Sequence, residues 1–415
     1  MEDDWWTSRL AAMVAVRAGG STLWVATAGR GMQRLPERAG VVVIGGGVIG
    51  TSTAFHLSEA GVEDVLLLDG GALGGGSTSK AAGGVRAMFS DELNIRLGMR
   101  SLEAFADFGR RPGQEIDLRR VGYLFLLDNP QHVEAMTRAV ELQNTLGLPS
   151  RMIGVEEAAA LSPLTGTEGL LAAALSPDDG HCTPESVVLG YATGARRYGA
   201  TIVAHCPVTG IVVQDGCIAA VRTPSGTVRT GTVVCAAGAW SAQVAGMAGL
   251  DLAVAPLRRQ IVITEAVPGL PAHQPFTIDF GSSFYFHREG PGLLMGMSDP
   301  DETPGFRLDR SDAWLPRLAE AVARRAPSLA EVGLRGGWAG LYEVTPDHNA
   351  LIGESSEVGR FLYATGFSGH GFLMGPAVGE VVRDLILRRP PPVDVSAMTA
   401  DRLRSRHLRP ETNLV

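Results

Sequence analysis

A short unit near the start of the chain, residues 41–69 (VVVIGGGVIGTSTAFHLSEAGVEDVLLLD), constrains the fold more than any other segment. Residues 41–44 are a continuous run of β-branched side chains followed by glycines, which is typical of a buried parallel strand. Residues 48–60 contain apolar side chains that would face a sheet, and a glycine follows them, which predicts a helix and its end. Residues 65–68 predict a second strand that ends at Asp69. The segment therefore predicts a βαβ unit, in which a helix connects two parallel strands.

The turn between the first strand and the helix has the pattern Gly45-x-Gly47-x-x-Gly50. In this pattern the first glycine permits a tight turn, the second lets the backbone approach a pyrophosphate, and the third allows the helix to pack on the strand. The helix N-terminus adds main-chain amides and the positive end of a dipole. Asp69 stands 19 residues after Gly50, where an acid at the end of the second strand accepts from ribose hydroxyls. The pattern predicts a dinucleotide site, but it does not separate NAD from FAD.

Composition excludes several other classes of protein. The 415 residues carry a formal net charge of −8 and contain no basic run, so we expect no nucleic-acid partner. No stretch approaches the roughly 20 apolar residues that span a membrane. The four cysteines form no CxxC and no Cys/His ligand spacing, so neither a metal site nor a dithiol site is expected. Isolated thiols suit a reducing compartment, and we expect a cytoplasmic protein.

The rest of the chain mixes strand-like and helix-like segments without a low-complexity linker. Strands are predicted within 121–127, 200–240, 256–265, 284–297 and 335–345, and helices over 130–147 and 311–326. Because no linker separates two blocks of sequence, we expect two domains that are interleaved, with the chain crossing between them several times.

Several segments together resemble a known family. A loop of small residues, GGGSTSKAAGGVR (74–86), follows the strand that ends at Asp69, and the strand-like TVVCAAGAW contains Gly238. The most specific segments are GGWAGLYEVTPDHNALIG (336–353) and GFSGHGFLMGPAVGE (366–380). With them the chain resembles, from about residue 40 to 395, the D-amino-acid oxidase superfamily of flavoproteins. Within it, the likeness is to glycine oxidase, sarcosine oxidase and the β subunits of bacterial amine and proline dehydrogenases.

The resemblance implies an α/β fold (α+β overall), in which a Rossmann-like FAD-binding domain is interleaved with a substrate domain built on a mixed, largely antiparallel sheet. We expect the FAD-binding domain to comprise residues 39–115, 173–255 and 345–400, and the substrate domain residues 116–172 and 256–344. Residues 1–38 would then be an N-terminal extension of unknown role, and residues 401–415 a C-terminal tail.

The resemblance also implies which residues hold the cofactor. The pyrophosphate would lie on Gly45, Gly47, Val48, Ile49 and Gly50, and the adenosine ribose beside Asp69 and Gly70. The diphosphate and one flavin face would contact Ser77, Thr78, Lys80, Ala82, Gly83, Gly84 and Val85, the adenine Val208, and the ribityl chain Ala237, Gly238 and Trp240. Gly366, Gly369, His370, Gly371, Phe372 and Leu373 would run along the isoalloxazine ring. A helix that begins near Met374 would direct its N-terminal amides at the negative charge of the reduced ring.

The implied activity is oxidation of the C–N bond of a small amine or secondary amino acid to an imine, by hydride transfer to flavin N5, with hydrolysis of the imine. Tyr285 and Tyr342 would form walls of the substrate pocket, although aromatic residues of strands also serve as core packing. His370 would bond the flavin edge or accept a proton, or else only order its loop. Arg86 and Arg258 would pair with a substrate carboxylate, or else be surface arginines.

The chain differs from its relatives at several positions. Gly340 stands where sarcosine oxidases attach the flavin to a cysteine, and residues 74–86 lack the histidine used by related subunits, so we expect FAD to be non-covalent. Leu294 and Leu373 replace two lysines, which predicts slow reaction with oxygen. Oxygen, a quinone or an electron-accepting protein would be the oxidant. We leave open whether the chain forms a homo-oligomer. Two other functions remain alternatives: a flavin-binding subunit of a multi-subunit amine dehydrogenase, and an NAD-dependent dehydrogenase.

Overall fold

The computed structural model describes residues 35–405 and 408–413. With the exception of Leu35, these residues belong to one unit, Pro36–Val415. The extension expected over residues 1–38 lies almost wholly outside the described residues.

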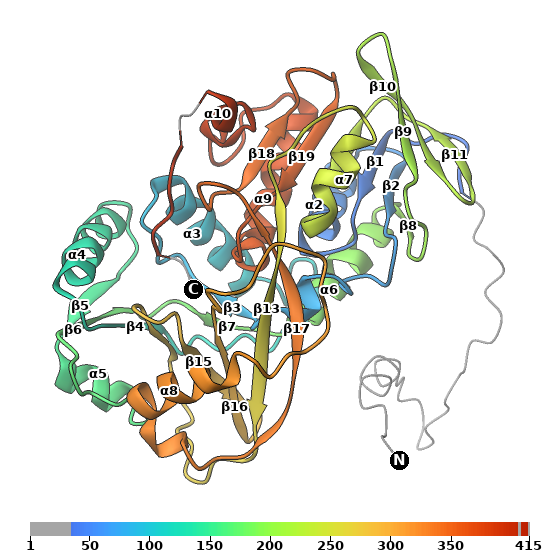
Figure 1. The fold of residues 1–415 in the computed structure, drawn as a ribbon. Helices are drawn as coiled ribbons and strands as arrows, with labels where there is room; N and C mark the ends of the chain where they lie inside the picture. The colour runs from blue at the N-terminus through green and yellow to red at the C-terminus, as the bar shows by residue number, and fades with distance from the viewer. Residues whose placement is uncertain (1–34, 406–407, 414–415) are drawn as a thin grey trace, which may run out of the picture. The chain divides into compact units, whose positions relative to one another are not determined.

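The predicted βαβ unit is present and lies within a six-stranded sheet (Figure 1). Its elements are β1 (Val41–Ile44), α2 (Val48–Glu59) and β2 (Val65–Leu68). The strand order is β18-β19-β12-β1-β2-β8, and every pair is parallel except β18 with β19. The remaining strands are β8 (Thr201–Val203), β12 (Val233–Cys235), β18 (Leu351–Glu354) and β19 (Phe361–Thr365).

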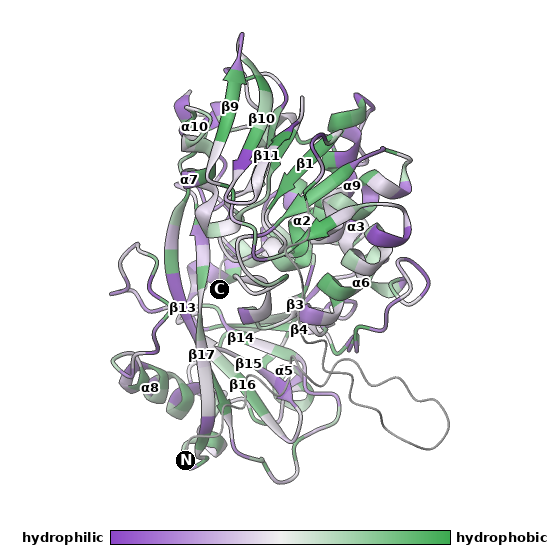
Figure 2. Ribbon diagram, turned by 90° about the vertical axis from the view of Figure 1, so that its right-hand side faces the viewer, coloured by the Kyte–Doolittle hydropathy of each residue, from purple (hydrophilic) through white to green (hydrophobic). Residues whose placement is uncertain are grey.

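Helix α2 packs against two other helices and is buried along almost its whole length. Its neighbours are α6 (Pro184–Arg197) and α9 (Gly371–Leu387), and α9 also packs on α3 (Glu92–Ala106). Figure 2 shows β1 coloured as hydrophobic along its length, as expected for a strand inside a core. The helix expected near Met374 begins three residues earlier, at Gly371, because packing against α2 outweighs the low helix propensity of glycine.

A second, eight-stranded sheet has the order β17-β13-β16-β15-β14-β4-β6-β5, and every pair is antiparallel except β14 with β4. Its strands are β4 (Tyr123–Leu127), β5 (Arg151–Ile153), β6 (Ala172–Ser176), β13 (Ala255–Thr264), β14 (Phe276–Asp279), β15 (Tyr285–Glu289), β16 (Gly292–Met297) and β17 (Leu334–Val344). This mixed, largely antiparallel sheet confirms the expected fold class.

The two faces of the eight-stranded sheet bury different partners. On one face Ile261 and Ile263 cluster with Tyr123 and Phe276. On the other face Val262 clusters with the apolar side of helix α8 (Leu315–Arg325). Successive side chains of a strand point to opposite faces, so β13 supplies residues to both clusters.

The remaining elements are smaller and include a three-stranded sheet, β11-β10-β9, and a two-stranded sheet, β3-β7. They are β3 (Gly84–Val85), β7 (Gly180–His181), β9 (Gly210–Gln214), β10 (Cys217–Thr223), β11 (Gly226–Arg229), α4 (Pro130–Thr145), α5 (Val155–Leu161), α7 (Ser241–Gly246), α10 (Asp401–Arg404) and the short helical turns Thr78–Lys80, Gly238–Trp240, Pro327–Leu329 and Ser396–Met398. In the described part of the chain, no helix is both long and apolar enough to cross a membrane.

We propose that the division into two domains follows the two sheets. All strands of the six-stranded sheet fall within 39–115, 173–255 and 345–400, the ranges expected for the FAD-binding domain. The expected boundary after residue 172 would cut through β6, which pairs with β4 and β5 in the other sheet. We therefore place that boundary after Ser176.

Candidate active site

A cavity of about 760 Å³ opens where the carboxyl ends of β1, β2 and β12 face the eight-stranded sheet. The residues that follow these strands, among them Gly45, Asp69 and Ala237, line it. The crevice beyond the carboxyl ends of parallel strands is the place where α/β folds bind nucleotides. The position of the cavity therefore agrees with the dinucleotide site that the sequence predicts.

The three glycines of the turn after β1 have three different surroundings. Gly45 has a φ of +112°, and a Cβ there would lie 2.2 Å from the carbonyl oxygen of Ala236. A Cβ on Gly50 would lie 1.8 Å from the carbonyl oxygen of Gly45, so this glycine lets α2 pack on β1. A Cβ on Gly47 would meet only Thr78 Oγ1, at 3.0 Å. Gly47 therefore leaves open the space that a pyrophosphate needs for close approach to the backbone.

Asp69 is held in place at the end of β2. Its Oδ2 accepts from the Gly46 amide at 2.5 Å, and its Oδ1 accepts from the Gly71 amide at 2.6 Å. Both contacts fix the carboxylate at the cavity wall, where its remaining lone pairs suit ribose hydroxyls.

Most residues expected to hold the cofactor do line the cavity. They are Gly45, Gly47, Val48, Ile49, Asp69, Gly70, Ser77, Thr78, Lys80, Ala82, Gly83, Gly84, Val208, Ala237, Gly238, Trp240, Gly369, His370, Gly371, Phe372 and Leu373. Three others, Gly50, Val85 and Gly366, are not among the lining residues: Val85 is buried in the core, and a Cβ on Gly366 would lie 2.5 Å from Thr345 Cγ2. The lining fits an FAD molecule, because it combines the glycine turn, the acid after β2 and the N-terminal turn of α9.

The other end of the cavity is walled by aromatic and apolar side chains of the eight-stranded sheet, including Tyr342 of β17. Tyr285 and Tyr342, both expected here, line it together with Tyr123, Ile261, Phe276 and Ile278. Burial raises the pKa of Tyr123, Tyr285 and Tyr342, so all three phenols keep their protons at neutral pH. This end offers hydroxyl groups within an otherwise apolar wall.

Arg86 is buried at the cavity wall and is held by neutral acceptors. Its Nη1 donates to the carbonyl oxygen of Met88, and its Nη2 donates to the carbonyl oxygen of Asn413 at 2.7 Å. The same Nη2 lies 3.2 Å from Nε2 of His370. The guanidinium also lies 4.2 Å from the ring centroid of Phe89. Within residues 35–405 and 408–413, the cation is therefore oriented without a carboxylate in direct contact.

His370 lies at the N-cap position of α9 and lines the cavity. Burial, reinforced by the charge of Arg86, holds its pKa well below the ordinary value of 6.5. Because an arginine can only donate, Nε2 accepts from Arg86 and the ring proton resides on Nδ1. His370 is a neutral imidazole that contacts Arg86 and the ring of Phe89, and its side chain makes no capping hydrogen bond to α9.

Arg258 does not line the cavity, contrary to the role that was expected for it. Its guanidinium pairs with Glu302 at 2.7 Å and with Asp309 at 3.3 Å. The neighbouring Arg259 lines the cavity instead, with its guanidinium 5.3 Å from the ring centroid of Tyr342. The reason is strand alternation, since adjacent residues of β13 point to opposite faces.

Sequence reasoning also missed Tyr123, Arg259, Phe276 and Glu343, which all line the cavity. Glu343 Oε2 accepts from Thr365 Oγ1 at 2.8 Å, and burial raises the pKa of this carboxyl to about 7. Tyr342 was expected at the site from the family resemblance, whereas the polar residue beside it matched no motif. In the sequence Arg259 is one of two adjacent arginines, and nothing there indicates which of the two lines the cavity.

Replacing Gly47 by valine is expected to abolish FAD binding and to leave the fold intact, because the new side chain enters the cavity where only Thr78 is near. Replacing Gly50 by alanine is expected to impair folding itself, since its Cβ would overlap the Gly45 carbonyl. FAD released from acid-precipitated protein measures binding, and circular dichroism measures folding. If folded Gly47→Val protein retained FAD, the assignment of the nucleotide to this turn would be wrong.

The raised pKa of Glu343 predicts a pH-dependent stability. The folded state binds its proton more tightly than the unfolded state, so the contribution is complete below pH 4.5 and is lost as pH rises through about 7. As pH rises from 4.5 to about 7, the free energy of unfolding of Glu343→Gln should increase by about 3 kcal/mol relative to that of the parent protein. Urea unfolding from pH 5 to 8 measures the difference, and a difference that stays constant with pH would contradict the prediction.

Comparisons with known proteins agree with this geometry. The family described as FAD dependent oxidoreductase (DAO) matches residues 40–385. The chain is 31% identical to mitochondrial dimethylglycine dehydrogenase of Rattus norvegicus, over 88% of this chain and 45% of that protein. It is 29% identical to 4-methylaminobutanoate oxidase (formaldehyde-forming) of Paenarthrobacter nicotinovorans, over 89% of this chain and 46% of that protein. It thus spans less than half the length of these curated relatives.

A solved structure covers the fold more completely. The crystal structure of L-proline dehydrogenase from P. horikoshii superposes with a TM-score of 0.85 at 33% identity, and the match covers 90% of this chain and all of that one. The chain belongs to the family of FAD-dependent oxidoreductases.

Proposed function

We propose that this chain oxidises the C–N bond of a small amine or amino acid that carries a carboxylate. The observation that supports this most is a pair of cavity-lining arginines, Arg86 and Arg259. Among the described residues, neither has an Asp or Glu oxygen within 4.0 Å. Both charges influence the pKa of Tyr342, which places them around one end of the cavity.

The charge of these arginines is the basis of the substrate class. A buried cation is costly unless it is paired, and a ligand carboxylate supplies that pairing through charge-assisted hydrogen bonds. Arginine has five N–H groups. Three of those on Arg86 are used by Met88, Asn413 and His370, which leaves the others for a ligand. The Nε of Arg259 is buried without a partner.

The remaining wall residues would orient and desolvate such a substrate. Tyr285 and Tyr342 present phenols whose protons are retained, and Phe276 and Ile278 exclude water. His370 is neutral and can accept or donate a hydrogen bond without adding charge. A neutral, aromatic surrounding favours the uncharged form of an amine over its ammonium form.

FAD, when bound, supplies the capacity to accept two electrons from the C–N bond. The chain would hold it without a covalent bond, because the cavity-lining residues include no cysteine and no histidine other than His370. Family membership favours FAD over the nicotinamide alternative. Relatives named for dimethylglycine, 4-methylaminobutanoate and proline support a substrate in which an amine and a carboxylate occur together.

Anaerobic titration of the purified protein tests the proposal directly. Amino acids with secondary or tertiary amines should bleach the flavin absorbance, whereas the matching amines without a carboxylate should not. Arg259→Met should raise the KM of the active amino acid by roughly 10- to 100-fold, as expected for the loss of a hydrogen bond to a charged group. Arg258→Met is the matched control and should keep the parental KM. Bleaching by no amine at all would favour the flavin-binding subunit alternative.

Lys80 is the only lysine among the 36 lysines and arginines of the chain, and it lines the cavity. Its carbonyl accepts from Trp338 Nε1 at 2.9 Å, and a Cβ on Gly340 would lie 2.5 Å from its own Cβ. Leu373 lines the cavity and Leu294 is buried in the core, so we assign the stabilisation of negative charge in the reduced enzyme to Lys80, which also lines the cavity.

Lys80→Met is therefore expected to slow reoxidation of the reduced protein by oxygen roughly 100-fold, while reduction by substrate stays near the parental rate. Lys80→Arg keeps the charge and should recover most of the loss. Stopped-flow reoxidation in aerated buffer, with and without a quinone acceptor, measures the effect. Equal reoxidation rates for the parent and Lys80→Met would show that another group carries this role.

A further inference from the structure

The described residues after α10, Leu408–Asn413, lie against the loop that carries Arg86; we call them the strap (Figure 1). Arg86 and Asn413 are 327 positions apart in sequence, yet Arg86 Nη2 donates to the Asn413 carbonyl at 2.7 Å. Asn413 and Glu411 are each only 2% exposed. Within the strap Glu411 and Asn413 are thus buried, whereas Leu408, Pro410 and Thr412 are exposed, and the buried Asn413 contacts the candidate substrate arginine.

Glu411 ties the strap to the start of helix α3. Its carboxylate accepts from the Ser90 amide at 3.0 Å, from Ser90 Oγ at 2.5 Å and from the Asp91 amide at 3.2 Å. It also accepts from Asn94 Nδ2 at 2.9 Å and, within the strap, from the Asn413 amide at 2.8 Å. One buried carboxylate therefore organises both the segment after Arg86 and the residue whose carbonyl bonds Arg86.

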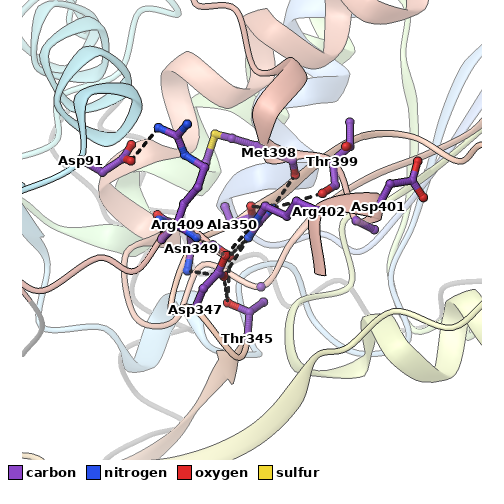
Figure 3. Close-up of polar contacts among 12 residues, drawn as sticks. Asp91, Thr345, Asp347, Asn349, Ala350, Met398, Thr399, Asp401, Arg402 and Arg409 are labelled. Carbon is purple, nitrogen blue, oxygen red and sulfur yellow. Dashed lines mark hydrogen bonds and ion pairs between the residues drawn. The ribbon is translucent and has the colours of Figure 1, made fainter. Parts of the chain in front are cut away.

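The other end of the strap has two anchors of its own, the carboxylates of Asp91 and Asp347 (Figure 3). Arg409 Nη2 pairs with Asp91 Oδ2 at 2.7 Å, and the Arg409 amide donates to Asp347 Oδ2 at 3.2 Å. Asp347 itself is paired with Arg402 through contacts of 2.8 and 2.9 Å. The strap is consequently fixed both at Arg409 and at Glu411, and its path between them is determined.

The partners of Arg86 give this arrangement a chemical consequence. Its acceptors are two main-chain carbonyls and a neutral imidazole, so its orientation is fixed without a salt bridge to any described residue, while the charges of Glu411 and Asp179 act on it from farther away. A salt bridge at the same place would compete with a substrate carboxylate, whereas a carbonyl dipole does not.

We propose that the strap positions Arg86 for the carboxylate of the substrate, and that Glu411 is the positioning residue through which it acts. The proposal rests on the proposed function, because it assigns Arg86 to the substrate. Removal of the Glu411 carboxylate leaves the amides of Ser90, Asp91 and Asn413 without their acceptor. The strap then loses its fixed path, and the Asn413 carbonyl no longer holds Arg86.

The test is a titration of the FAD-containing holoenzyme with methoxyacetate, a carboxylate without an amine, followed by perturbation of the flavin spectrum. Glu411→Ala should raise the Kd for methoxyacetate by at least about tenfold, with unchanged FAD content. Glu411→Gln keeps one acceptor oxygen and should give an intermediate Kd. Glu357→Gln makes the same change at an exposed residue that pairs with Arg404, and should behave as the parent does.

Hydrogen exchange at the amides of Ser90 and Asp91 gives a second readout, which should be faster in Glu411→Gln than in the parent. A purely structural role would instead lower FAD content or thermal stability and leave the Kd for methoxyacetate unchanged, and that result would overturn the proposal. If Glu411→Ala fails to fold, Glu411→Gln and Arg409→Gln decide the question by the same titration.

The two proposals fail in different ways. If the parent binds methoxyacetate, Arg86→Met does not, and Glu411→Ala binds as the parent does, the strap has no positioning role while the assignment of Arg86 stands. If the parent does not bind methoxyacetate, or Arg86→Met binds it equally well, Arg86 is not the carboxylate site and the role of the strap falls with it.

Discussion

Glycines let helix α2 pack on its neighbours more closely than larger side chains would allow. The position of the cavity depends on this close packing. Gly50 lets the helix approach the backbone of β1, and Gly45 lets the turn approach the end of β12. On the opposite side, a Cβ on Gly379 of α9 would lie 2.2 Å from Ser52 Oγ of α2. These contacts bring the N-termini of α2 and α9 to one cavity, so that two sets of helix amides face the same bound molecule.

The eight-stranded sheet adds a different electrostatic environment at the other end of the cavity. There the side chains are phenols with raised pKa values, apolar residues and two arginines without acidic partners in the described part of the chain. On helix α8, which packs on the same sheet, the buried Arg325 is paired with two acids, Asp279 and Asp128. The contrast indicates that the unpaired charge is a property of the site rather than of the fold.

Expectations from the sequence were most accurate where function depends on the backbone of a local segment. The turn after β1, the acid after β2 and the loop 366–373 are short segments whose glycines constrain their own geometry, and most of their residues line the cavity. The expectation was wrong for Arg258 because two adjacent arginines look alike in sequence, and only the register of β13 on β17 decides which one faces inward. Helix α3 was not anticipated, although Asp91 caps it by accepting from the Leu93 and Asn94 amides.

The sequence by itself determined the βαβ unit, the glycine turn, the interleaved order of the two sheets and the family, because each depends on residues that are close along the chain or on a pattern of segments. Tertiary structure alone decided which charges remain unpaired in the cavity and which groups orient them. The carbonyl that holds Arg86 comes from Asn413, and the acids near it come from distant elements. Such contacts join residues 92 to 327 positions apart, so no local pattern of side chains encodes them.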